Sequence, residues 1–175
     1  MQTKSFHIVV TGPESTGKTT LSRRLAGHFE GGWVPEYARY YLEELGRPYR
    51  REDLLVIAQG QWRWERHALE QAADWVFSDT SLLVLKVWSD YRYGTTDEWI
   101  LEQLRCYPPA GYLLCAPDLP WEADPQRENP HDREELFDVY QRELEALRFP
   151  YRIVRGADPG ERFRRAVAAV ADLRR

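Results

Sequence analysis

The chain has 175 residues, a length that suits one domain with a sizeable hydrophobic core. Hydrophobic residues make up 43% and charged residues 30%, as in ordinary globular proteins, and the net charge of −4 argues against a nucleic-acid binder. No apolar stretch approaches the roughly 20 residues of a membrane span, and the histidines and cysteines lack metal-ligand spacing, so a membrane protein and a zinc protein are disfavoured.

Apolar runs and amphipathic stretches alternate along the chain. The apolar runs predict strands at 5–10, 32–35, 74–79, 111–117 and 151–156. The amphipathic stretches predict helices at 17–30, 36–45, 51–73, 81–94, 96–107, 133–147 and 159–175. This alternation predicts an α/β fold: a three-layer sandwich with a five-stranded parallel sheet and helices on both faces. Such sheets bind ligands beyond the carboxyl ends of their strands, so residues at those ends are the most informative.

A phosphate-binding loop follows the first predicted strand. Gly12, Gly17, Lys18 and Thr19 satisfy the pattern G-x-x-x-x-G-K-[ST]. The glycines let the backbone wrap so that N–H groups face an anion, and the helix that follows adds its positive dipole end. Lys18 is expected to reach the β- and γ-phosphates and Thr19 to ligate Mg²⁺. The predicted ATP-binding residues are Gly12, Glu14, Ser15, Thr16, Gly17, Lys18, Thr19 and Thr20.

A P-loop indicates nucleoside triphosphate binding but leaves the reaction open. A regulatory GTPase needs an Asn-Lys-x-Asp motif, whereas Asn129 is the only asparagine and a proline follows it. A motor or AAA-type ATPase usually carries an Asp-Glu pair after a hydrophobic strand, whereas Asp79 is followed by Thr80. Nucleotide and small-metabolite kinases are favoured, and they need an acceptor pocket and a lid that excludes water.

Glu36 is the candidate acceptor-side acid, because it follows the second predicted strand. If the segment is helical from this residue, Arg39 and Tyr40 share its face. A carboxylate there can orient a substrate hydroxyl or accept its proton. The alternative is that Glu36 only complements the dipole at a helix start.

The candidate lid is a proline-rich, charged loop at 118–132. Its Arg127, and Arg133 directly after it, are expected to stabilise charge on a transferring phosphoryl group. The alternative is a solvated loop without a role in the reaction. We predict a lid over about 118–134 within a single P-loop kinase domain that covers 1–175.

Several aromatic residues are candidates for stacking on a base, although each one alone is more often part of a core. Trp62 and Trp64 lie two apart, so a helix cannot bury both on one face. Trp88 and Tyr91 follow the strand that ends in Asp79, and Trp121 lies in the predicted lid.

Five segments resemble the ribosylnicotinamide kinase domain of NadR-type NAD-salvage proteins. They are "GPESTGKTTL", "PEYARYYLE", "AQGQWRWE" with Gln61 and Glu65, "FSDTSLLVLKVWSDYRYG" and "DLPWEADPQRENPHDREELFDVY", and together they span nearly the whole chain. The resemblance implies a P-loop, nucleoside-kinase-like fold and ATP-dependent phosphorylation of the 5′-hydroxyl of nicotinamide riboside to nicotinamide mononucleotide.

The resemblance also implies roles for single residues. Lys18 and Thr19 would contact ATP and Mg²⁺, Asp79 would lie by the metal, and Glu36 would lie by the acceptor hydroxyl. Because the nicotinamide ring is a cation, it favours an aromatic face and a carboxylate neighbour. The predicted substrate-binding residues are Glu36, Arg39, Trp88, Tyr91, Trp121 and Asp124, and the predicted catalytic residues are Lys18, Glu36, Arg127 and Arg133.

Two departures from related families are visible. Multidomain NadR-type proteins carry an adenylyltransferase domain and sometimes a DNA-binding module, and we expect neither here. Deoxynucleoside kinases have Asp-Arg-Ser at a strand end where this chain has Asp79-Thr80-Ser81. A kinase for another nucleoside or small metabolite, and a nucleotide-sensing ATPase without an acceptor, remain alternatives. We expect a cytoplasmic protein whose partners are ATP and a riboside, with no nucleic acid or membrane, and a homo-oligomer is left open.

Overall fold

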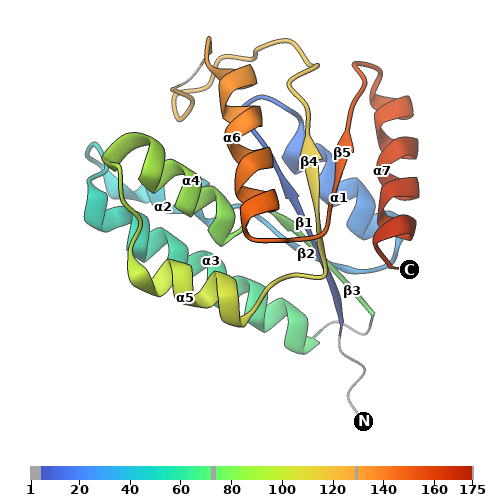
Figure 1. Cartoon of the computed structure of the whole chain (residues 1–175), viewed down its shortest axis with the longest axis horizontal. Helices are drawn as coiled ribbons and strands as arrows, with labels where there is room; N and C mark the ends of the chain where they lie inside the picture. The colour runs from blue at the N-terminus through green and yellow to red at the C-terminus, as the bar shows by residue number, and fades with distance from the viewer. Residues whose placement is uncertain (1–4, 72–73, 129, 175) are drawn as a thin grey trace.

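The computed structural model describes residues 5–71, 74–128 and 130–174, and its centre is one parallel sheet (Figure 1). The ends of two predicted helices, at 72–73 and 175, and Asn129 in the predicted lid lie outside these residues. The sheet has five strands in the order β2-β3-β1-β4-β5. The strands are β1 (Phe6–Thr11), β2 (Gly32–Val34), β3 (Trp75–Asp79), β4 (Gly111–Cys115) and β5 (Tyr151–Val154). The predicted five-stranded parallel sheet is therefore confirmed.

Burial on both faces explains why the central strands are continuous apolar runs. Every residue of β3 and β4 is buried, and so is β1 after its first residue. Parallel strands covered on both sides have no polar face and therefore show no alternation of polar and apolar residues. The register pairs Val10 of β1 with Asp79 of β3 and with Leu113 of β4. Asp79 thus lies beside the start of the phosphate loop.

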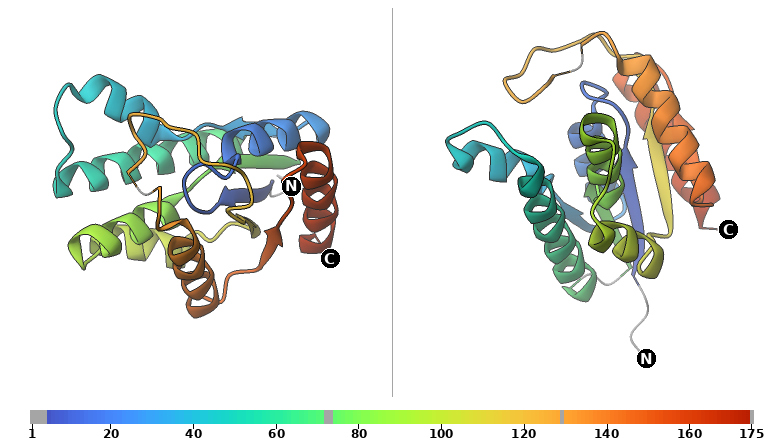
Figure 2. Two further views of the ribbon diagram at one scale, coloured as in Figure 1. Left: turned by 90° about the horizontal axis from the view of Figure 1, so that it is seen from above. Right: turned by 60° about the vertical axis from the view of Figure 1, so that its left-hand side comes forward.

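Helices cover both faces of the sheet and complete the predicted three-layer sandwich (Figures 1 and 2). Two apolar clusters form, one under α1 and α7 and the other under α3 to α6. The helix α2 packs against α3. The helices are α1 (Lys18–His28), α2 (Tyr37–Leu45), α3 (Arg51–Gln71), α4 (Leu82–Tyr93), α5 (Glu98–Cys106), α6 (Arg133–Ala146) and α7 (Pro159–Leu173).

Helix ends lie within three residues of the predicted ones, because capping residues fall just outside the helices. Ser81 caps α4 by accepting a hydrogen bond from Leu83 N–H, and Asp158 caps α7 by accepting from Glu161 N–H. Among the described residues, no helix is long and apolar enough to cross a membrane.

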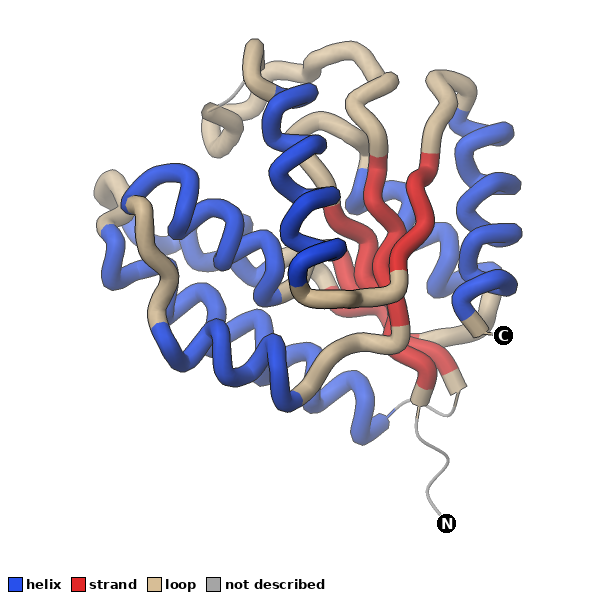
Figure 3. Tube along the Cα trace, viewed as in Figure 1, coloured by secondary structure: helices blue, strands red, loops and turns tan. Residues whose placement is uncertain are grey.

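The carboxyl ends of all five strands meet at one edge of the sheet (Figure 3). The P-loop follows β1, Glu36 follows β2, and Asp79 ends β3. The loop at 118–132 follows β4 and leads to α6, and its described residues form neither helix nor strand. This edge therefore collects most of the residues that the sequence analysis singled out.

Candidate active site

The P-loop wraps tightly between β1 and α1. Gly12 has φ 132°, and a Cβ there would lie 2.7 Å from the carbonyl oxygen of Cys115, so only glycine fits. Gly17, in the left-handed conformation, precedes α1, and no side chain caps this helix. The first N–H groups of α1 are therefore open to an anion, as the motif requires.

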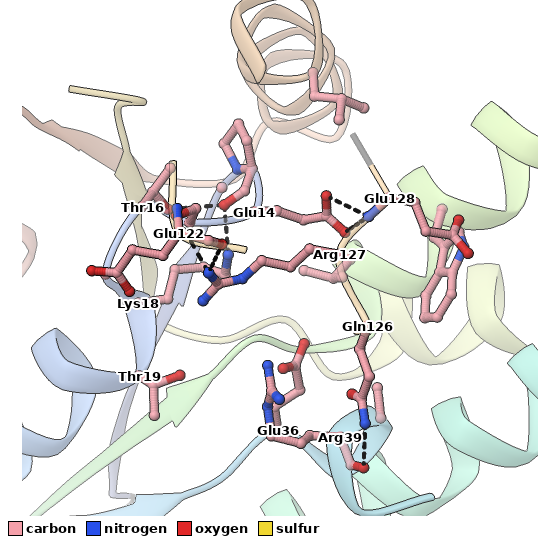
Figure 4. A pocket seen from close by; sticks show the side chains of 18 of the residues that line it. Glu14, Thr16, Lys18, Thr19, Glu36, Arg39, Glu122, Gln126, Arg127 and Glu128 are labelled. Carbon is pink, nitrogen blue, oxygen red and sulfur yellow. Dashed lines mark hydrogen bonds between the residues drawn. The ribbon is translucent and has the colours of Figure 1, made fainter. Parts of the chain in front are cut away.

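A cavity of about 680 Å³ lies over the P-loop and extends toward α2 and α4. All the predicted ATP-binding residues, from Gly12 to Thr20, line it. Glu36 and Arg39 line it from α2, Trp88 and Tyr91 from α4, and Arg127 from the 118–132 loop. Figure 4 shows Glu36 and Arg39 across the cavity from Glu14 and Thr16, with the Arg127 side chain reaching between them. The P-loop residues and the residues predicted for the acceptor side thus line the same cavity.

Lys18 and Thr16 both bond to the same carbonyl group of the P-loop. Lys18 Nζ donates to Pro13 O at 2.6 Å and Thr16 Oγ1 donates to it at 2.9 Å. The Lys18 side chain therefore lies along the inside of the loop, over the start of α1. This position lets the ammonium group contact a phosphate held by the loop.

Thr19 and Asp79 provide the oxygen atoms that a magnesium ion needs. Thr19 Oγ1 donates to Asp79 Oδ2 at 2.5 Å, whereas the buried Asp79 Oδ1 has no hydrogen-bond partner in the part of the chain that the structure describes. Burial raises the pKa of Asp79, and the Thr19 hydroxyl and Lys18 oppose this shift. The described residues contain no cluster of three or more His, Cys, Asp or Glu side chains able to hold a metal. Mg²⁺ beside phosphates needs only one or two protein oxygens, so the residues fit the ion.

Glu36 is the N-cap residue of α2 and faces the cavity instead of capping its own helix. Loss of hydration raises the pKa of Glu36 to about 7, and the negative charge of Asp79 adds to this shift. Lys18 and Arg39 act in the opposite direction. A carboxylate whose pKa lies near neutral pH is well matched to accept a proton from a hydroxyl.

The 118–132 loop is bonded to the P-loop along one side of the cavity. Ser15 Oγ accepts a hydrogen bond from Glu122 N–H at 2.9 Å, and the Glu14 carboxylate accepts one from Glu128 N–H at 3.1 Å. Arg127 donates to the Glu122 carbonyl and lies 3.5 Å from Ser15 Oγ. Glu14, an unusual residue beside a phosphate site, therefore points at the loop.

The other side of the loop is bonded to α2 and α4. Arg39 pairs with Asp124 at 3.1 Å, and Gln126 Nε2 donates to Arg39 O at 3.3 Å. Glu128 accepts from Arg92 at 3.2 Å and from the Tyr49 hydroxyl at 3.1 Å. These bonds thus connect the loop both to the P-loop and to the residues of α2 and α4 that line the cavity.

Trp88 and Tyr49 form an aromatic pair at the far end of the cavity. Trp88 Nε1 donates to the Tyr49 hydroxyl at 3.0 Å, and the two rings meet edge to face with centroids 4.8 Å apart. Tyr91 also lines the cavity, with 44% of its surface exposed. This end therefore offers aromatic surface beside the Glu128 carboxylate, across the cavity from the P-loop.

Besides Asp79, which is buried beneath Thr19, three residues predicted for the site do not line the cavity, and their contacts explain why. Arg133 donates to the carbonyls of Ser15 and Leu119, so it ties the loop to the P-loop. Trp121 lies with its ring 5.8 Å from the Arg133 guanidinium carbon, and Asp124 is engaged by Arg39. These contacts hold Arg133, Trp121 and Asp124 outside the cavity lining, and the roles expected for them against the ligands stay predictions.

Tyr40 also departs from expectation. Because Glu36 lies before the first turn of α2, the helical spacing that would align it with Tyr40 does not apply. Tyr40 is 54% exposed and packs beside Tyr37 and Trp64. Trp62 packs instead against Trp99 and Tyr107. Neither Trp62 nor Trp64 lines the cavity.

Tyr49 and Arg162 line the cavity but were missed by the sequence analysis. Arg162, 4% exposed, donates to the carbonyls of Thr16, Ala116 and Gly156 and so joins the P-loop to the ends of β4 and β5. Neither residue belongs to a motif or spacing that would predict its position at the cavity: Arg162 is one of several charged residues of a helix, and Tyr49 follows a turn.

The strand order and the P-loop define a P-loop nucleotide-binding domain, and residues of α2 and α4 line the cavity together with the P-loop. Residues 7–162 match the model of a family described as an AAA domain, and the chain belongs to this family. No curated protein matches the chain at the sequence level.

Solved structures of two kinds share the fold. A NadR protein in complex with NR is 22% identical, with a TM-score of 0.82 over 97% of this chain. A NadR protein with NAD and AMP-PNP is 25% identical, with a TM-score of 0.75 over 97% of this chain. This chain spans about half the length of both, 51% and 50%. Thymidylate kinase from Ehrlichia chaffeensis is 14% identical, with a TM-score of 0.69 over 99% of this chain and 100% of its own.

These matches confirm the predicted P-loop, nucleoside-kinase-like fold and the resemblance to NadR-type proteins. The family description differs from the sequence analysis, which favoured a kinase over an AAA-type ATPase. Membership in this family describes the P-loop domain and does not specify the reaction. The reaction depends on the residues around the cavity, where Thr80 and not glutamate follows Asp79.

Proposed function

We propose that this protein is an ATP-dependent kinase that phosphorylates the 5′-hydroxyl of nicotinamide riboside and releases nicotinamide mononucleotide. The observation that carries the proposal is the position of Glu36, a carboxylate across one cavity from the P-loop with a pKa raised to about 7. A protein that only senses a nucleotide needs no such acid. Two structures of similar fold, described as NadR protein with NR and with NAD and AMP-PNP, support the choice of riboside.

In the proposed reaction Glu36 accepts the proton of the 5′-hydroxyl group while the hydroxyl oxygen forms a bond to the γ-phosphorus of ATP. The bond from that phosphorus to the β,γ-bridging oxygen breaks, and ADP leaves. Lys18, the N–H groups of the P-loop and Arg127 stabilise the charge on the phosphate oxygens. Thr19 and Asp79 would hold Mg²⁺, which supplies further positive charge when it is bound with ATP.

The residues of the 118–132 loop act in this proposal as a lid. Its bonds to the P-loop and to α2 direct the Arg127 side chain between Glu14 and Glu36 (Figure 4), which supports a role for Arg127 between the two proposed substrate sites. A closed lid excludes the water that would otherwise take the phosphoryl group. In this proposal Arg133 and Asp124 attach the lid to the rest of the domain, and Arg127 is the lid arginine that contacts the phosphate oxygens. The single domain over 1–175, the cytoplasmic location and the oligomeric state stay predictions.

The aromatic end of the cavity is the proposed site of the nicotinamide ring. Trp88, with Tyr49 at its edge and Tyr91 nearby, offers the faces that a cationic ring favours. Glu128 supplies a carboxylate there in place of Asp124. A kinase for another nucleoside would use the same stacking, so stacking alone does not identify the acceptor.

A comparison of acceptors decides between nicotinamide riboside and other nucleosides. ADP release should be measured with Mg·ATP over a panel of ribosides and nucleosides, and nicotinamide riboside should give the highest kcat/KM.

The charge of the ring gives a prediction for Trp88. We expect Trp88→Leu to narrow the preference for nicotinamide riboside over uridine by roughly tenfold, which corresponds to about 1.4 kcal/mol. Leucine keeps apolar surface but lacks the negative ring face, whereas neutral uridine loses stacking alone. The measurement is kcat/KM for both substrates. Trp121→Leu is the matched control and should leave the preference unchanged, because Trp121 lies outside the cavity lining. Equal losses for both substrates in Trp88→Leu would reject selection by charge.

The lid gives a prediction for proteolysis. We expect trypsin cleavage after Arg127 to slow several-fold when a non-hydrolysable ATP analogue is added, because the guanidinium then contacts the γ-phosphate and orders the loop. ADP, which lacks that phosphate, should protect less. An unchanged cleavage rate with the analogue would count against a lid.

A further inference from the structure

The start of α2 is capped from a neighbouring helix. The side chain of Glu36, its N-cap residue, makes no capping bond. The first N–H groups of a helix need acceptors from outside it. Tyr37 N–H donates to Gln61 Oε1 of α3 at 2.8 Å, although the two residues lie 24 apart in the chain. Gln61 thus satisfies the first N–H group of α2, while the Glu36 carboxylate faces the cavity.

Gln61 is held in one orientation inside the protein. It is 1% exposed, and its Nε2 lies 3.3 Å from Oε1 of Glu65, one turn further along α3. Because the amide nitrogen is directed at Glu65, the amide oxygen is directed at Tyr37. Burial raises the pKa of Glu65 to about 8, so this neighbour adds little negative charge at neutral pH.

Gly60 lets the ring of Tyr37 rest on the same turn of α3. A Cβ at Gly60 would lie 2.1 Å from Tyr37 Cε1 and 2.3 Å from Cζ. Alanine is the better helix former, so glycine here serves the approach of the ring and not the helix. Two consecutive residues of α3 therefore hold Tyr37, Gly60 through its ring and Gln61 through its N–H group.

The held peptide is the one that joins Tyr37 to Glu36. Its orientation sets ψ of Glu36, which is 111°, and with it the direction of the Glu36 side chain relative to α2. We infer that Gln61 is a positioning residue that holds Glu36 toward the acceptor hydroxyl by fixing the peptide between Glu36 and Tyr37. The inference rests on the proposed role of Glu36 in proton transfer.

A double-mutant cycle between Gln61→Met and Glu36→Gln tests this inference, since methionine keeps the length of glutamine but offers no oxygen acceptor. We expect Gln61→Met alone to lower kcat about tenfold with KM for ATP unchanged. In the Glu36→Gln background the same substitution should lower kcat by less than about twofold, because there is no proton acceptor left to position. Equal losses in both backgrounds would overturn the inference and leave Gln61 a packing residue.

Glu65→Gln is the matched control, because it changes the same buried pair but keeps an oxygen for Gln61 Nε2 and leaves the bond to Tyr37 intact. Its kcat should match the parent, and a loss as large as that of Gln61→Met would overturn the inference. If melting curves show that Gln61→Met does not fold, Gly60→Ala replaces it in the cycle, with the same coupling to Glu36 expected. Parent-level kcat for Glu36→Gln alone would instead reject the proposed role of Glu36, so the two failures are distinguishable.

Discussion

The Glu36→Gln variant is expected to turn over about 10²–10⁴-fold more slowly than the parent, because the amide cannot accept the hydroxyl proton. Riboside Kd should change far less, since the amide still accepts a hydrogen bond. The measurement is kcat together with Kd and melting temperature. If Glu36 served only the helix dipole, the variant would lose about 0.3–1 kcal/mol of stability and keep its turnover.

The pH dependence provides an independent check on the same residue. Burial raises the pKa of Glu36 to about 7, and the residue must be deprotonated to act as a base. The kcat/KM of the parent should therefore rise with pH through about 7 and then level off. Glu36→Gln should lose this step and keep only the slow residual rate. A step of the same midpoint in both proteins would assign the titration to another group.

The Lys18→Ala variant is expected to lower kcat by about 10²–10³-fold, the scale of losing one donor that stabilises transition-state charge. The P-loop should keep its shape, because Thr16 still donates to the Pro13 carbonyl. Turnover of the variant and its affinity for an ATP analogue should be measured together.

Lys86→Ala is the control for Lys18→Ala. Lys86 bonds Asp90 and Glu143 and does not line the cavity, so its loss should affect stability and leave turnover near the parent value. Turnover of Lys18→Ala within twofold or threefold of the parent would remove Lys18 from the mechanism.

Local sequence was enough to predict the parts of the site that depend on short spacings. The P-loop is one continuous segment between a strand and a helix, and its glycines have the conformations that the motif requires. Glu36 and Asp79 were found because each lies at the end of a parallel strand, and all those ends meet at one edge.

Contacts between segments far apart in the sequence could not be predicted. Arg127 and Arg133 look equivalent in the sequence, but only the path of the loop directs Arg133 to the carbonyls of Ser15 and Leu119. Tyr49 joins the site because it meets Trp88, 39 residues away. A turn tyrosine gives no sign of such a partner. The exposed position of Tyr40 followed from where α2 begins, and helix ends are the least predictable part of a helix.

The most direct test of the central claim is the stoichiometry of phosphoryl transfer. The purified protein should be incubated with Mg·ATP and nicotinamide riboside, and ADP and nicotinamide mononucleotide should be quantified by chromatography. A riboside kinase forms the two products in equal amounts and forms no phosphorylated product from the 5′-deoxy analogue of the riboside. ADP released at the same rate with and without the riboside, and without mononucleotide, would contradict a kinase and indicate an ATPase.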